Sequence, residues 1–253
     1  MHLEEQGPLS PLGSDAPGQP REVGDLRSRA PEHTALYAIA CQGRQGSTYL
    51  ERILDAHPQV QCAGEIFSDY AFKGHGAGAI EEQLLIRVFS SDKAVVGFKL
   101  SAGDLMRHQE LAGIVRSFGF KIILLTRENL LDQFISFQLA ILNGAYVAEM
   151  PGKGITKFST SHEELKRGFE NLAFTDLAMS ALVAGLPSLP ITYEALIRPE
   201  SQIQIFEFLG VDPMIIEPRS TKQRSGGQKD AIENYDAMKE VFADTRWAKY
   251  FVE

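Results

Sequence analysis

A short loop near the start of the chain carries residue types that bind anions. Gly43 and Gly46 allow a tight turn, Ser47 and Thr48 offer hydroxyl donors, and Arg44 offers a permanent forked positive charge. The loop lies between an apolar run and a helix-like segment, so its backbone N–H groups should converge on one point. Such a pattern alone is also an ordinary strand-to-helix turn. Its place after the first strand of an alternating pattern favours an anion-binding loop.

Elements on either side must hold this loop, and the chain alternates short apolar runs with amphipathic segments. Apolar runs of this length are typical of buried parallel strands, and apolar spacings of three and four indicate helices. The sequence therefore predicts an α/β fold, with a parallel sheet flanked by helices on both faces. The expected strands are 35–41, 59–63, 94–100, 121–126 and 190–193, and the expected helices are 47–56, 80–90, 104–118 (capped by Asp104), 129–143, 163–184 and 199–209.

Length and composition indicate one catalytic domain. With 253 residues, 44% of them hydrophobic, the chain can bury one sizeable core, which we place at 34–253. Residues 1–33 are rich in Pro, Gly, Ser and charge, which predicts a disordered tail. A net charge of -8 disfavours a nucleic-acid partner.

The same composition predicts a cytoplasmic protein. No apolar run approaches the ~20 residues that span a bilayer, and no basic-then-apolar secretion signal is present at the N-terminus. Cys41 and Cys62 lack CxxC spacing, which fits a reducing compartment, predicts buried inert thiols and argues against structural zinc.

The loop differs from a Walker A loop, because Gly46 stands where GxxxxGK[ST] requires lysine. The run Arg44-Gln45-Gly46-Ser47-Thr48-Tyr49 resembles instead the 5'-phosphosulfate loop of sulfotransferases that use 3'-phosphoadenosine-5'-phosphosulfate (PAPS). That loop has a basic residue, a variable residue, Gly, two Ser/Thr and an apolar or aromatic residue. Gln45 stands where the family commonly has a small residue. The resemblance implies a P-loop-NTPase-like sheet, a PAPS donor and no metal.

A second element of the family is an arginine at a strand end followed by a serine on the next helix, which together hold the 3'-phosphate. Arg127 and Ser136 match it. The form TRENLLDQFISFQLA is similar to bacterial carbohydrate sulfotransferases of the trehalose and nodulation-factor type. Strand ends of a parallel sheet lie on one edge, so Arg127 should lie near Arg44. The alternative is that Arg127 pairs with a carboxylate and Ser136 is an ordinary helix residue.

Two later segments extend the resemblance to the C-terminus. ITYEALIRPESQIQIFEFLGVDP resembles the family's Y-E-x-L segment, and KQRSGGQKDAIENYDAM resembles its late K-Q loop. The likeness implies that Lys222, Gln223 and Arg224 close over the nucleotide, with a solvated basic turn as the alternative. Tyr193 and Glu194 are expected to be structural, tying the fifth strand to its neighbours.

Sulfuryl transfer needs a base to take the acceptor proton and cations to balance charge on the leaving phosphate. Glu65 follows the second strand and matches the Glu that several carbohydrate sulfotransferases use as base. His75 is its rival, in a glycine-rich segment, whereas His57 precedes a proline and suggests a structural hydrogen bond. Arg44 would stabilise the bridging oxygen, while the two hydroxyl residues of the loop orient the phosphosulfate.

Two other functions are weighed against this one. A P-loop kinase would need Mg²⁺ and a loop lysine, and Lys73 and Lys99 both lie outside the loop. A catalytically inactive nucleotide-binding protein of the same fold is the other. The acceptor should be a small hydroxyl compound, with a carbohydrate as the leading guess, bound by segments 67–78 and 144–160. Among oligomers, a homodimer is the commonest for soluble enzymes.

Overall fold

The structure is a computed structural model that describes residues 35–145, 152–217 and 226–252. The expected tail at 1–33 and the expected nucleotide-closing residues Lys222, Gln223 and Arg224 lie outside the described residues.

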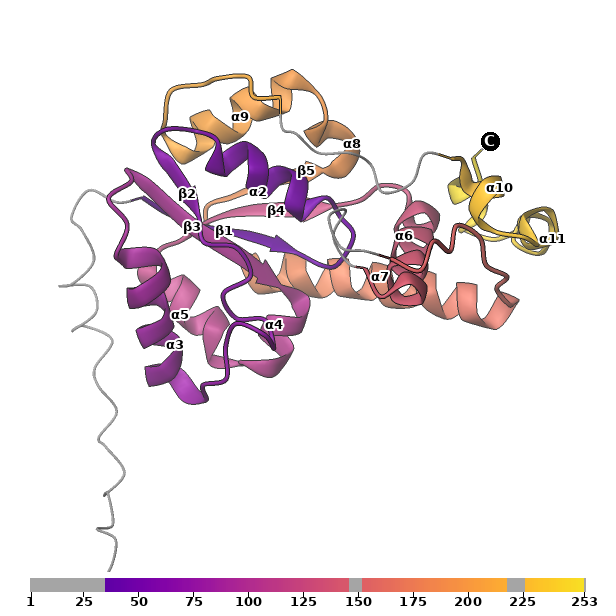
Figure 1. Ribbon diagram of the computed structural model, residues 1–253, viewed down its shortest axis with the longest axis horizontal. Helices are drawn as coiled ribbons and strands as arrows, with labels where there is room; N and C mark the ends of the chain where they lie inside the picture. Colours follow the sequence, from indigo (N-terminus) through magenta and orange to yellow (C-terminus); the bar gives the residue numbers. More distant parts are fainter. Residues whose placement is uncertain (1–34, 146–151, 218–225, 253) are drawn as a thin grey trace, which may run out of the picture.

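A five-stranded parallel sheet forms the centre of the molecule, with strand order β2-β3-β1-β4-β5 (Figure 1). Because β1 sits in the middle, the chain leaves it toward one edge for β2 and β3 and toward the other for β4 and β5. The crevice at the carboxyl end of β1 is therefore a topological switch point, where ligands bind in open α/β sheets. The strands are β1 Ala35–Cys41, β2 Val60–Cys62, β3 Val95–Ser101, β4 Lys121–Thr126 and β5 Ser188–Thr192.

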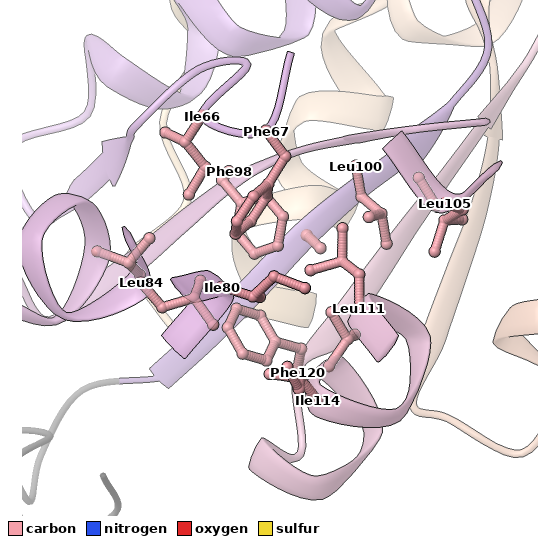
Figure 2. Packing of buried hydrophobic residues seen from close by; sticks show 14 of the residues in the cluster. Ile66, Phe67, Ile80, Leu84, Phe98, Leu100, Leu105, Leu111, Ile114 and Phe120 are labelled. Atoms are coloured by element: carbon pink, nitrogen blue, oxygen red, sulfur yellow. The ribbon is translucent and has the colours of Figure 1, made fainter. Parts of the chain in front are cut away.

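Helices cover both faces of the sheet, which confirms the expected layered α/β architecture (Figure 1). On one face, Tyr37 and Ile39 of β1 pack with buried residues of α2 and α9. On the other, β3 residues such as Phe98 pack with Phe67, Ile80 and helices α3 to α5 (Figure 2). A third cluster joins α6 and α7 to the C-terminal helices. The helices are α2 Ser47–Asp55, α3 Gly76–Leu84, η1 Leu85–Phe89, α4 Ala102–Arg107, α5 Glu110–Phe118, α6 Leu130–Asn143, α7 His162–Val183, α8 Tyr193–Leu196, α9 Pro199–Leu209, α10 Gln228–Ala231, α11 Tyr235–Val241 and η2 Ala248–Tyr250.

The expected single helix over 104–118 is wrong, because two helices occupy that span. Ser101 caps α4, and Asp104 is the third residue of that helix, completing a capping box rather than acting as the cap. The helix stops because His108 leaves the helical region, at φ -128° and ψ 81°, and buries its ring 5.1 Å from Phe72. The strand β5 also ends one residue earlier than expected, at Thr192, whose hydroxyl caps the short helix α8.

Candidate active site

The anion-binding loop lies at the carboxyl end of β1, as the sequence predicts. Gly46 caps α2 in the left-handed region, at φ 88°, and Arg44 has a positive φ of 69°. A non-glycine residue in this region costs about 1–3 kcal/mol and persists only where its surroundings hold it. Such strain gathers at ligand-binding turns, which makes this loop a candidate site.

Tyr193 of α8 packs directly against the loop. A Cβ on Gly46 would overlap the Tyr193 ring, so this position must be glycine for space as well as for its backbone conformation. The same ring lies 4.9 Å from the guanidinium of Arg127. Tyr193 was expected to be only a structural residue, whereas here it lies between the loop and a predicted ligand-binding arginine.

Three predicted ligand-binding residues meet at the loop. Arg44 Nε donates to Ser136 Oγ at 2.9 Å, and Arg127 Nη1 donates to the backbone carbonyl of Arg44 at 3.2 Å. Burial lowers the pKa of Arg44, and the neighbouring Arg127 charge adds to this. Two like charges held together at a partly buried site favour an anion between them.

Carboxylates also surround Arg127, which partly bears out the alternative expectation. Its Nη2 lies 3.8 Å from Asp132 Oδ2, and its Nε lies 3.9 Å from Glu194 Oε1. Glu194 itself accepts from the backbone N–H of Glu128 at 3.0 Å, just ahead of α6. Its structural role is therefore confirmed, and it fixes the chain segment that carries Arg127.

A buried lysine on β3 completes the site. Lys99 Nζ lies 2.7 Å from Glu51 Oε2, 3.1 Å from Glu65 Oε1 and 3.4 Å from Thr48 Oγ1. Burial works to lower the pKa of Lys99, but Glu51 and Glu65 outweigh it, and the net shift is upward. Lys99 therefore stays charged, and it joins the expected base to the loop. Sequence reasoning set it outside the loop, although a lone lysine in an apolar strand is an available signal.

The candidate bases differ clearly in position. The Glu65 side chain is 56% exposed and held by Lys99 beside the loop. His75 is exposed ahead of α3, and none of the hydrogen bonds or ion pairs found among the described residues joins it to the loop. His57 is buried, accepts from Gln59 N–H at 3.1 Å and contacts Asp212 O at 3.0 Å, which confirms a structural role.

The other loop residues are partly or fully buried. Ser47 opens α2, and Tyr49 is partly buried on the same helix, where burial and the nearby Tyr193 raise its pKa. Gln45 is fully buried.

In the part of the chain that the structure describes, no cluster of three or more His, Cys, Asp or Glu side chains could hold a metal ion. Over the same residues, no helix is long and apolar enough to cross a membrane.

Comparisons with known proteins bear on this arrangement. No protein-family model matches the chain. Nodulation protein H of Rhizobium meliloti (strain 1021) is 24% identical over 236 residues, which cover 85% of this chain and 94% of that protein. Mouse sulfotransferase SULT7A1 complexed with PAP superposes with a TM-score of 0.50 and 14% identity over 90% of this chain and 92% of its own. A sulfotransferase from Alicyclobacillus acidocaldarius gives a TM-score of 0.48 and 17% identity, over 85% of this chain and 92% of its own.

The chain has the fold of the sulfotransferase family. The expected parallel-sheet fold class is thereby confirmed. Within this sulfotransferase fold, a cavity of about 410 Å³ opens beside Gly43, between α6 and α7. It lies elsewhere than the segments 67–78 and 144–160, from which we expected the acceptor pocket. Its lining combines aromatic, amide and charged side chains: Gln42, Gly43, Phe134, Phe137, Gln138, Glu164, Arg167, Gly168, Asn171, Leu172 and Thr175.

Proposed function

We propose that this chain is a sulfotransferase that transfers the sulfuryl group of PAPS to a hydroxyl of a small acceptor. One observation carries the proposal: Arg44, Ser136 and Arg127 converge at the loop after β1. PAPS presents a 5'-phosphosulfate and a 3'-phosphate, so it needs two sets of cations and donors at one edge of the sheet. The loop amides with Arg44 suit the first group, and Arg127 with Ser136 suits the second.

Glu65 takes the acceptor proton in this mechanism. The acceptor oxygen attacks sulfur, the bond between sulfur and the bridging phosphate oxygen breaks, and 3'-phosphoadenosine-5'-phosphate (PAP) leaves. The Arg44 guanidinium stabilises charge on that bridging oxygen. The Lys99 ammonium, 3.1 Å from Glu65, holds the carboxylate in place and lies within 3.4 Å of Thr48 on the donor side.

The acceptor in this proposal is a carbohydrate-like molecule held in the cavity beside Gly43. The Phe137 side chain is 41% exposed there and offers an apolar face, while Gln138, Asn171 and Thr175 offer hydrogen-bonding groups. Aromatic surface combined with a few polar groups is what small-molecule sites present. We place the reaction in the cytoplasm, which two free buried cysteines support.

Transfer from sulfur-labelled PAPS to a panel of sugars and phenols tests this function. We expect at least one sugar to be sulfated, and Glu65→Gln to lower kcat by about 10²–10⁴-fold with PAP affinity retained. Glu82→Gln, an exposed carboxylate on α3, is the matched control and should change neither. Full turnover by Glu65→Gln would place the base elsewhere. Phosphate transfer from ATP with Mg²⁺, in place of sulfate transfer, would favour the alternative function as a kinase.

The acceptor cavity has a separate test. With a sugar that accepts sulfate, Phe137→Ala should raise the KM for that sugar about tenfold and leave PAP affinity unchanged, since even one missing methylene contact in an apolar pocket costs about 1–3 kcal/mol. Ile141→Ala removes another exposed apolar side chain from α6 and serves as control. Equal KM values for the two variants would place the acceptor outside this cavity.

A further inference from the structure

Gln45 departs from the small residue that stands in the family loop, and its side chain is fully buried. A buried carboxamide must have partners for its donor and its acceptor. Gln45 Oε1 accepts from the backbone N–H of Gln42 at 2.9 Å, which closes the loop on itself. Its Nε2 donates to Asp176 Oδ1 on α7 at 2.7 Å. The loop is thus tied to a helix that lies 131 residues further along the chain.

The same carboxylate oxygen holds the other end of the loop. Gln42 Nε2 donates to Asp176 Oδ1 at 2.6 Å and to the backbone carbonyl of Leu172 at 3.0 Å. Asp176 therefore receives both carboxamides that flank Gly43 and Arg44. Burial raises the pKa of Asp176, while the bonds from Gln45 and Gln42 oppose that rise.

The two residues between these anchors include the strained one. Arg44 has φ 69°, and its guanidinium reaches Ser136 Oγ at 2.9 Å. A left-handed conformation at a non-glycine residue persists only where neighbouring structure imposes it. Bonds that fix residues 42 and 45 to one oxygen impose the turn between them.

We propose that Asp176 is a positioning residue that clamps the anion-binding loop and thereby aims Arg44 at the phosphosulfate of the donor. This inference rests on the proposed function, because PAPS is the ligand it would serve. The clamp acts through geometry and not through charge, since a carboxylate near a bound anion repels it. An asparagine keeps an acceptor oxygen at the same place, so Asp176→Asn should preserve the clamp that Asp176→Ala removes.

Calorimetric titration with PAP and with adenosine 3'-phosphate tests the clamp. The second nucleotide lacks the phosphate that the loop would hold. We expect Asp176→Ala to weaken the binding of PAP at least tenfold and that of adenosine 3'-phosphate less than twofold. Asp176→Asn should change the affinity for either nucleotide by less than threefold. Gln45→Met fills the same buried space without the hydrogen bonds and should match Asp176→Ala. Glu170→Ala removes an exposed carboxylate from the same helix and is the control.

Different failures point to different parts of the account. If wild type fails to bind PAP, the proposed function falls and the clamp falls with it. If wild type binds PAP and both Asp176→Ala and Gln45→Met bind it equally well, the clamp alone is overturned. If Asp176→Ala weakened the binding of both nucleotides equally, Asp176 would be a general structural residue, and the clamp would also be overturned. The double variant Gln45→Met/Asp176→Ala should be no weaker than either single one, because both remove one clamp.

Discussion

Removal of the buried Lys99 ammonium should lower the stability of the protein. Lys99→Met keeps the apolar stem and removes an ammonium 2.7 Å from Glu51 Oε2 and 3.1 Å from Glu65 Oε1. At an effective dielectric constant near 20 those separations correspond to about 6 and about 5 kcal/mol of attraction. Most of this is offset, because a buried ammonium loses hydration worth several kcal/mol and the exposed Glu65 carboxylate is screened by water. We expect a net loss of about 2–3 kcal/mol in the free energy of unfolding, at or just below the 3–5 kcal/mol that broken fully buried pairs cost, because Glu65 is largely exposed.

Urea unfolding at pH 7 measures this loss directly. The corresponding fall in melting temperature is about 4–12 °C for a chain of this size. Lys157→Met removes an exposed lysine and should change stability by less than about 0.5 kcal/mol. In a double-mutant cycle, Lys99→Met and Glu51→Gln should couple by about 1–2 kcal/mol, because the two groups are in contact. Additive effects, or a Lys99→Met protein as stable as wild type, would refute the reasoning.

Two further predictions concern the loop glycines and the thiols. Gly46→Ala should abolish PAP binding and lower the free energy of unfolding by about 1–3 kcal/mol, since position 46 has a left-handed backbone and a Cβ there would overlap Tyr193. Gly43→Ala is the control, because a Cβ at position 43 would make only ordinary contacts. Equal PAP affinity of the two variants in calorimetry would contradict this prediction. Burial raises the pKa of Cys41 from 9.0 to about 12 and that of Cys62 from 9.0 to about 11. The folded protein therefore keeps thiol protons that the unfolded chain releases, so the free energy of unfolding should fall as the pH rises above 9. Thiol labelling of the folded protein at pH 8 should be slow, because both thiols stay protonated and buried. Rapid labelling would show that the thiols are accessible.

Local patterns predicted most of the fold. The run KIILLT and its neighbours lie as parallel strands because apolar runs of this length can only be buried between helices. The break between α4 and α5 escaped prediction, since it depends on His108 packing against Phe72, a contact between distant segments.

The candidate site divides in the same way. Arg44 and Arg127 were predicted to lie near each other, because strand ends share one edge of a parallel sheet, and the family resemblance added Ser136 on the next helix. Lys99 and Asp176 were missed as site residues, since their partners are set by the packing of β3 beside β1 and of α7 beneath the loop. A charged residue in a buried strand is a local signal for the first, and no local pattern marks the second.

Titration of the wild-type protein, Arg44→Ala and Arg127→Ala with PAP, beside ATP with Mg²⁺, tests the central claim most directly. The account predicts PAP binding without metal, weakened by each substitution by about 1.5–3 kcal/mol, which is the range for hydrogen bonds to charged groups and corresponds to roughly 10–150-fold. Binding of ATP with Mg²⁺ and none of PAP, or PAP affinity untouched by both substitutions, would contradict it.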